Sequence, residues 1–158
     1  MTNKERPTQL EMVFDKGGRL TATLMWDKAP KTCEGIVNTL KKHGPYTARL
    51  LHAQYAGSEV YFENFPVEGQ LPFENTTLRM DENMFVTNKI DGGVLAFYVN
   101  PKILSFCIVY GTLIPRRTAD VEIALNMFAE IDDKEEARRI GDRARWEGPG
   151  SVTVKILD

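Results

Sequence analysis

The sequence is poor in the residues that carry most metal and nucleophilic chemistry. It holds two histidines and two cysteines in 158 residues. A protein metal site needs three or four converging His, Cys or carboxylate ligands, and no G-x-x-x-x-G-K-S/T phosphate-binding motif is present. We therefore expect no metal and no cofactor. Cys33 and Cys107 are far apart in the chain, and we interpret both as free thiols in core positions.

Long apolar runs and an excess of basic residues are also missing. The longest apolar stretch, 103–113, is interrupted by polar residues and glycine, whereas a membrane helix needs roughly 18 apolar residues in a row. The first residues carry no apolar segment of the kind that begins a secretory signal. The net charge is −2, and Arg116-Arg117 and four arginines within 138–145 are the only basic clusters. We expect a cytoplasmic protein that binds neither membranes nor nucleic acid.

Short segments in which apolar and polar residues alternate are plentiful, and this pattern is typical of antiparallel strands. The clearest pair, 9–14 and 19–26, flanks a turn at Asp15-Lys16-Gly17-Gly18. The segments 92–99 and 103–110 are apolar on both faces, so we expect both of their faces to be covered. Further strands are predicted at 48–55, 59–62, 121–131 and 152–156.

Two helices interrupt the strands. The first is predicted to begin near Pro30 and to end before Gly44, with apolar residues at helical spacing. The second is predicted over 133–146, because Asp133 and Glu136 form a capping-box pattern. Residues 63–84 are read as a long irregular excursion. The sequence therefore predicts one domain over residues 1–158, a mainly β fold in which about eight strands form a closed antiparallel barrel capped by two α-helices.

Several short motifs resemble those of cyclophilin-like barrels, in particular bacterial members of unassigned function. The resemblance covers most of the chain and implies a cyclophilin-like fold. It is carried by Ala29-Pro30-Lys31-Thr32-Cys33, by the run from His52 to Phe62, by Gly93 to Tyr98, by Ile108-Val109-Tyr110-Gly111, by Asn126 to Ala129 and by Glu147-Gly148.

The chain departs from the cyclophilins that isomerise X-Pro bonds. Their F-H-R strand and their F-x-x-Q-G-G-D-F string have no counterpart here, and His52 is followed by Ala53-Gln54. Peptidyl-prolyl isomerase activity is therefore the least favoured alternative, since fold kinship alone does not confer function.

The candidate catalytic residues are His52 and Glu59. If the strands that hold them pair, His52 meets Glu59 or Tyr61 across the ladder. A carboxylate or hydroxyl partner orients an imidazole as a general base. A histidine that is simply hydrogen-bonded on the barrel surface is the alternative.

A set of polar and aromatic residues is predicted to bind the substrate. Glu74 and Asn75 lie in the excursion, where the related bacterial proteins carry a similar E-N step, so the loop is expected to fold over a pocket. For Asn75 a capping or turn role is the alternative. The other candidates are Gln54, Tyr61, Tyr98 and Tyr110. Aromatic residues line such a pocket or belong to the core: Phe62, Phe65, Phe73, Phe85 and again Tyr98.

Two functions follow from these patterns, and the sequence does not choose between them. In the first, the protein binds a small organic molecule and acts by acid–base isomerisation or hydrolysis of a small polar substrate. In the second, it is a non-catalytic module that holds a partner or self-associates as a homo-oligomer. The sequence identifies neither the ligand nor the role of residues 63–84.

Overall fold

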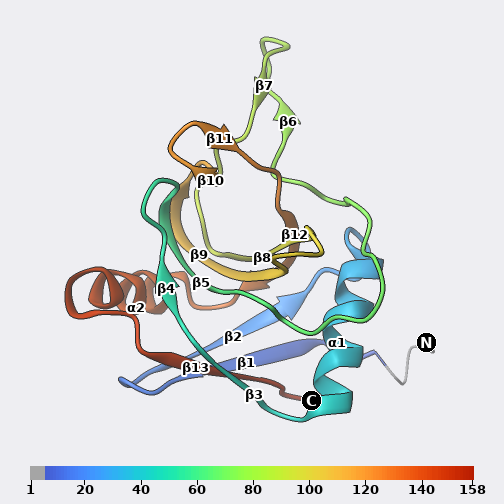
Figure 1. Cartoon of the computed structure of the whole chain (residues 1–158), viewed down its shortest axis with the longest axis vertical. Coiled ribbons are helices and arrows are strands. Elements are labelled where there is room, and N and C mark those ends of the chain that lie inside the picture. Colours follow the sequence, from blue (N-terminus) through green and yellow to red (C-terminus); the bar gives the residue numbers. More distant parts are fainter. Residues whose placement is uncertain (1–5) are drawn as a thin grey trace.

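The computed structural model describes residues 6–158, and its centre is a nine-stranded antiparallel sheet rolled into a nearly closed barrel (Figure 1). The strands follow one another around the sheet in the order β3 (Tyr46–Arg49), β13 (Ser151–Ile156), β1 (Gln9–Phe14), β2 (Arg19–Leu24), β12 (Asn126–Ile131), β8 (Val94–Tyr98), β9 (Ser105–Leu113), β5 (Gly57–Phe62) and β4 (Leu51–His52). Only Leu50 separates β3 from β4 in the chain, so the two edges of the sheet meet through the backbone. The predicted closed antiparallel barrel is confirmed.

The two predicted helices are confirmed as well, and they lie on different sides of the barrel (Figure 1). Helix α1 (Pro30–His43) packs on β12 and β13, and helix α2 (Lys134–Glu147) packs on β5 and β9. Asp133 caps α2 by accepting a hydrogen bond of 3.0 Å from the backbone N–H of Glu136, as its spacing predicts. Within residues 6–158, neither helix has the length and apolar character that a membrane crossing requires.

Side chains of β5, β8 and β9 alternate between two apolar layers. Phe62, Phe97 and Phe106 point into the barrel and are at most 1% exposed. Their neighbours on the outer face join a second buried cluster, which consists of Ile90, Ala96, Cys107, Val109, Leu113 and Leu125. Both faces of these strands are therefore covered, as the two-sided apolar pattern of the sequence predicts.

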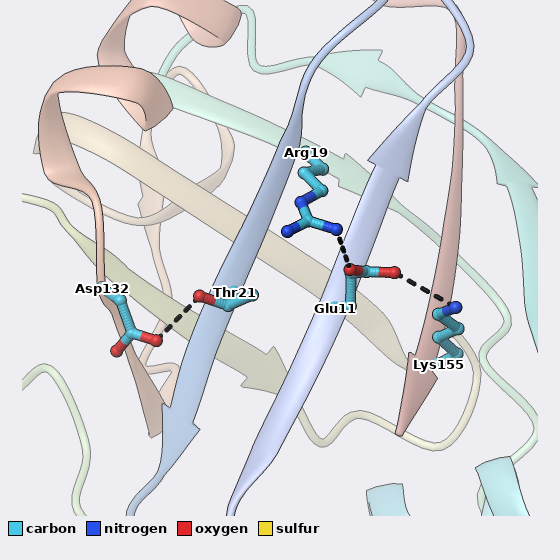
Figure 2. A network of polar contacts seen from close by, with 5 residues as sticks. All are labelled: Glu11, Arg19, Thr21, Asp132 and Lys155. Atoms are coloured by element: carbon cyan, nitrogen blue, oxygen red, sulfur yellow. Dashed lines mark hydrogen bonds and ion pairs between the residues drawn. The ribbon is translucent and has the colours of Figure 1, made fainter. Parts of the chain in front are cut away.

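The outer face of β13, β1 and β2 is polar instead (Figure 2). Glu11 is only 4% exposed, and its two carboxylate oxygens lie 3.1 Å from Arg19 Nη1 and 3.2 Å from Lys155 Nζ. Beside this group, the hydroxyl of Thr21 donates a 2.8 Å hydrogen bond to Asp132. The second apolar layer is thus confined to the side of the barrel formed by β5, β8 and β9.

Two of the predicted strands are divided in the structure. Residues 48–55 break at Leu50, where the chain leaves β13 as partner and joins β5, and residues 53–56 lie outside any strand. Residues 121–131 split into β11 (Val121–Glu122) and β12, and β11 pairs with β10 (Arg116–Thr118), a strand that the sequence did not predict. These corrections arise because short chain segments change partners.

The excursion contains a small hairpin of its own, formed by β6 (Arg79–Met80) and β7 (Val86–Thr87). The hairpin projects away from the barrel (Figure 1). Its apolar side chains are solvent-exposed, with Met84 at 75% and Phe85 at 69% of full exposure.

Candidate functional site

A cavity of about 170 Å³ lies on the outer face of β5, β8 and β9, against the β10–β11 hairpin. In Figure 1 this hairpin is seen beside the ends of β5 and β9. The strands supply the cavity with a mixture of apolar and polar side chains, because outward-facing positions of all three strands converge there. Its principal polar and aromatic residues are Gln54, Glu59, Tyr61, Glu63, Tyr98, Ser105, Cys107, Arg116 and Arg117.

Glu59 is the buried acid of this cavity. Its side chain faces outward from β5, and the residue is 7% exposed. Burial raises the pKa of the Glu59 carboxyl from 4.5 to about 7, and a hydrogen bond with Cys107 opposes this increase. Within residues 6–158, Glu59 forms no ion pair. A buried carboxyl without a cation is costly in its charged form, so Glu59 exchanges its proton near neutral pH.

Two groups beside Glu59 remain protonated at neutral pH. Cys107 lies on β9 opposite Tyr61 in the strand register, and burial together with the Glu59 charge raises the pKa of its thiol well above the usual value. Burial also raises the pKa of Tyr61, as does the charge of Glu63. Cys107 and Tyr61 are therefore neutral neighbours of Glu59 at pH 7.

Arg116 and Arg117 form the basic part of the cavity wall. They follow Pro115 at the start of β10, and Arg116 is half-buried whereas Arg117 is exposed. Neither guanidinium forms an ion pair within the described chain, residues 6–158. Both charges are thus available to a ligand.

The structure brings together four of the predicted site residues: Gln54, Glu59, Tyr61 and Tyr98 all line the cavity. Glu59 and Tyr61 share one face of β5, and Tyr98 comes from β8. Gln54 lies in the segment between β4 and β5 and is exposed at the rim.

His52 and Tyr110 lie elsewhere. In the register of β4 and β5, His52 is opposite Val60, which points into the barrel core. The expected contact of His52 with Glu59 or Tyr61 is therefore not formed, since both of those residues face outward. Instead, His52 Nε2 lies 2.6 Å from the hydroxyl of Tyr110, another residue of the inner core.

Glu74 and Asn75 do not line the cavity but fasten the excursion to the barrel. Glu74 Oε1 accepts a 2.5 Å hydrogen bond from the backbone N–H of Thr32 in the first turn of α1. The Asn75 amide donates to the carbonyl of Met127 at 2.8 Å, and its φ angle of 45° is left-handed, a conformation that asparagine tolerates. The pair therefore serves helix capping and loop attachment in this structure.

The candidate aromatic residues also lie in different parts of the structure. Phe62 and Phe65 are buried in the inner core, with ring centroids 5.9 Å apart, whereas Phe73 and Phe85 are exposed. None of these four phenylalanines lines the cavity, whereas Tyr98 and Tyr61 do.

Sequence reasoning missed Arg116, Arg117, Glu63 and Ser105 as cavity residues. The two arginines gave the only usable signal, an adjacent basic pair directly after Pro115. Cys107 was expected to be inert packing, and it is indeed buried, but it also touches the cavity beside Glu59. Residues 6–158 contain no group of three His, Cys, Asp or Glu side chains arranged to hold a metal ion.

Comparison with known proteins places the chain in a family. Residues 13–155 match the family described as "Protein of unknown function (DUF3830)". The chain belongs to this family. No curated protein matches it.

Solved structures show that the DUF3830 fold is cyclophilin-like, as the sequence motifs predict. A hypothetical protein from Archaeoglobus fulgidus is 19% identical, with a TM-score of 0.59 over 99% of this chain and 100% of its own. A cyclophilin-type peptidyl-prolyl isomerase of Cryptosporidium parvum is 15% identical, with a TM-score of 0.56 over 95% of this chain and 99% of its own.

A further similar structure is McbB, which was solved in complex with tryptophan. It is 21% identical, with a TM-score of 0.55 over 93% of this chain. The chain spans 44% of the length of McbB. At these sequence identities the structural similarity establishes only the fold. The function has to be argued from the residues of the cavity.

Proposed function

We propose that this protein binds a small organic molecule in the outer cavity and that Glu59 transfers a proton of that ligand. The observation that carries the proposal is a buried carboxyl in the cavity wall, with a pKa of about 7 and no ion pair within residues 6–158. Buried acids in folded proteins are usually paired. An unpaired one with a shifted pKa in a cavity is therefore a candidate functional group.

The size of the cavity supports a ligand with about one ring. An engineered cavity of roughly 150 Å³ binds benzene, and the present cavity measures about 170 Å³. Tyr61 and Tyr98 offer aromatic surface, while Gln54 and Ser105 offer hydrogen-bonding groups. Apolar walls with a few convergent polar groups are the usual composition of a small-molecule site.

The protonation of the cavity is suited to isomerisation. Burial raises the pKa of Cys107 and Tyr61 and keeps them protonated, whereas Glu59, with a pKa of about 7, can both take and give a proton at neutral pH. A single group of this kind takes a proton from one ligand atom and returns it to another, so that no atom is gained or lost.

A binding screen with two matched tryptophan variants tests the site. Fragments that include tryptophan, the molecule held by McbB, are ranked by thermal shift at pH 7, because a ligand of the native state raises the melting temperature. Ile123→Trp fills the cavity and is expected to abolish binding. Ile114→Trp is the control, since Ile114 is similarly half-buried but does not line the cavity. Ligands that bind both variants equally, or a screen without hits, would contradict the site.

A deuterium-exchange experiment tests the role of Glu59. Ligands from the screen are incubated with the protein in D₂O, and the loss of their C–H signals is followed by NMR. We expect exchange with the natural chain, with a rate that rises through pH 7, and no exchange with Glu59→Gln despite retained binding. The charged or titratable groups that line the cavity with Glu59 are Cys107 on β9, Tyr55, Tyr61 and Glu63 beside or on β5, Tyr98 on β8, and Arg116 and Arg117 on β10. Equal exchange by both proteins would eliminate Glu59 as the base, and no exchange by either would leave a binding module without catalysis.

A further inference from the structure

The outer cavity has walls of opposite charge, and from this we infer that its ligand is a small carboxylic acid that also carries an amine or a hydroxyl group. The inference rests on the proposed binding site and adds the class of molecule that the site accepts. The basic wall is formed by Arg116 and Arg117, and the acidic wall by Glu59 and Glu63.

The basic wall is suited to a carboxylate. The two guanidinium groups are adjacent in the chain and, within residues 6–158, have no acidic partner. The acid opposite Arg116 in the β10–β11 register is Glu122, whose Oε1 lies 3.4 Å from the side-chain amide of Asn88. A guanidinium presents a planar set of donors that matches the two oxygens of a carboxylate, and such charge-assisted pairs are among the strongest hydrogen bonds in proteins.

A buried polar cluster holds the basic wall in place. Asn88 is 6% exposed and donates a 2.9 Å hydrogen bond to the carbonyl of Ile123, a cavity residue that follows β11. Its own side-chain oxygen accepts a 2.6 Å hydrogen bond from Thr77, which is fully buried. The hydroxyl of Thr77 in turn accepts from the backbone N–H of Leu125 at 3.2 Å. The hairpin that carries the arginines is therefore fixed before a ligand arrives, which reduces the entropy lost on binding.

The acidic wall is suited to a hydrogen-bond donor. Glu59 and Glu63 are four residues apart, at alternate positions that share the outward face with Tyr61. Glu63 is exposed at the rim, whereas Glu59 is buried at the inner side. Carboxylates accept hydrogen bonds from an ammonium or hydroxyl group of a ligand. A ligand with only an anionic group would offer neither of these acids a hydrogen-bond donor.

The two walls together define how such a ligand lies. Its carboxylate faces β10, its amine or hydroxyl faces β5, and its ring or chain contacts Tyr61 and Tyr98. This orientation brings the carbon that bears the amine or hydroxyl toward Glu59, the group proposed to transfer a proton.

Four probes of nearly equal shape test the inference by isothermal titration calorimetry. They are phenylglycine, mandelate, phenylacetate and phenylacetamide, which carry respectively an amine and a carboxylate, a hydroxyl and a carboxylate, a carboxylate alone, and no charge. We expect phenylglycine and mandelate to bind most tightly and phenylacetamide at least tenfold more weakly than phenylacetate. The Arg116→Ala/Arg117→Ala double variant is expected to remove the preference for phenylacetate over phenylacetamide. Arg138→Ala is the control, because Arg138 is an exposed arginine on α2 outside the cavity.

Glu63→Gln tests the acidic wall separately. This exposed residue tolerates substitution, and its change is expected to weaken phenylglycine severalfold while leaving phenylacetate within twofold. The inference would be overturned if phenylacetamide bound as well as phenylacetate, or if the double arginine variant kept the natural preference. In that case the site itself still stands when Ile123→Trp abolishes binding of the same probes. Failure of all four probes in the natural chain, together with hits from the wider screen, would likewise reject the ligand class and retain the site.

Discussion

The Nε2 atom of His52 lies 2.6 Å from the hydroxyl oxygen of Tyr110, on the inner side of the barrel wall. Its other ring nitrogen, Nδ1, is 2.8 Å from the carbonyl oxygen of Ala53. Both nitrogens of this imidazole thus have protein partners, and neither is directed at the outer cavity. The geometry separates the histidine from Glu59, although only six residues lie between them in the chain.

Replacement of His52 by alanine is expected to change stability but not ligand binding. The substitution removes a partly buried hydrogen bond and the packing of the ring on Tyr110, which together contribute about 1–2 kcal/mol to the free energy of unfolding. Urea denaturation measures this loss, and titration with a cavity ligand is expected to give a dissociation constant within twofold of the natural one. If the His52→Ala protein folded but no longer bound the ligand, the result would show that the imidazole takes part in ligand binding.

The stability of the protein is expected to decrease as the pH rises from 4.5 to 7. Glu59 has a pKa of about 7 in the folded chain and an ordinary value near 4.5 when unfolded, so between these values the folded state binds more protons. Stability then falls with increasing pH and becomes constant above the folded pKa. The difference across this window is about 3 kcal/mol for a group buried this completely.

Glu59→Gln is the control for this pH effect, because the amide stays neutral at every pH. We expect the variant to be more stable than the natural protein at pH 8 and similar to it at pH 5, as measured by thermal or urea denaturation in a series of buffers. Parallel pH profiles for the two proteins would show that Glu59 is not the group responsible.

The barrel could be predicted because its information is local. Alternation along β1 and β2 and the two-sided apolar pattern of β8 and β9 are visible in single segments of sequence. The position of His52 could not be predicted in this way, because it depends on register. The predicted strand is interrupted at Leu50, and the register of β5 against β9 shifts between Gly57 and Glu59. A slip of one residue turns a side chain to the opposite face.

Long-range polar contacts explain most of the remaining differences. Glu74 caps α1 across 42 residues of chain, and Asn126 is fully buried in β12 because its amide donates to Thr32 and to the carbonyl of Pro72. Neither of these long-range hydrogen-bonding contacts produces a periodic pattern in the sequence. Arg116 and Arg117 become cavity residues only because β10 and β11 fold back over the outer face, and two short strands of this kind are not distinguishable from a loop in sequence.

Glu11 and Glu130 provide a matched comparison of buried and exposed ion pairs. Glu11 is paired with Arg19 and Lys155 at a side-chain exposure of 5%, whereas Glu130 is paired with Lys134 at 57%. Because Glu11→Gln removes a desolvated charge from between two cations (Figure 2), we expect it to cost roughly 1–3 kcal/mol. Glu130→Gln is expected to cost less than about 0.5 kcal/mol. Urea denaturation at low salt measures both, and equal losses would mean that the burial of Glu11 does not strengthen its contacts.

Gly141 and Gly35 offer a test of how α2 packs on the barrel. Both glycines lie inside helices, where alanine is intrinsically favoured by about 1 kcal/mol. A Cβ at position 141 would lie 2.2 Å from Cγ of the buried Tyr110 ring, whereas one at position 35 would meet the ends of the Leu71 and Val67 side chains, at 3.0 and 3.3 Å. We expect Gly141→Ala to destabilise the protein by roughly 1–3 kcal/mol, and Gly35→Ala to be neutral or slightly stabilising.

The Tyr110→Ala background identifies the cause of that loss. Without the ring, the three atoms nearest to the added methyl group at position 141 are absent. Gly141→Ala is then expected to cost little or to stabilise the protein, and the two changes are expected to be strongly non-additive. The same double-variant comparison, made by urea denaturation, also tests the packing around His52, because the Tyr110 ring lies between that imidazole and α2. If Gly141→Ala destabilised the Tyr110→Ala protein as much as the natural one, the close approach of α2 to β9 would not be the reason for glycine at position 141.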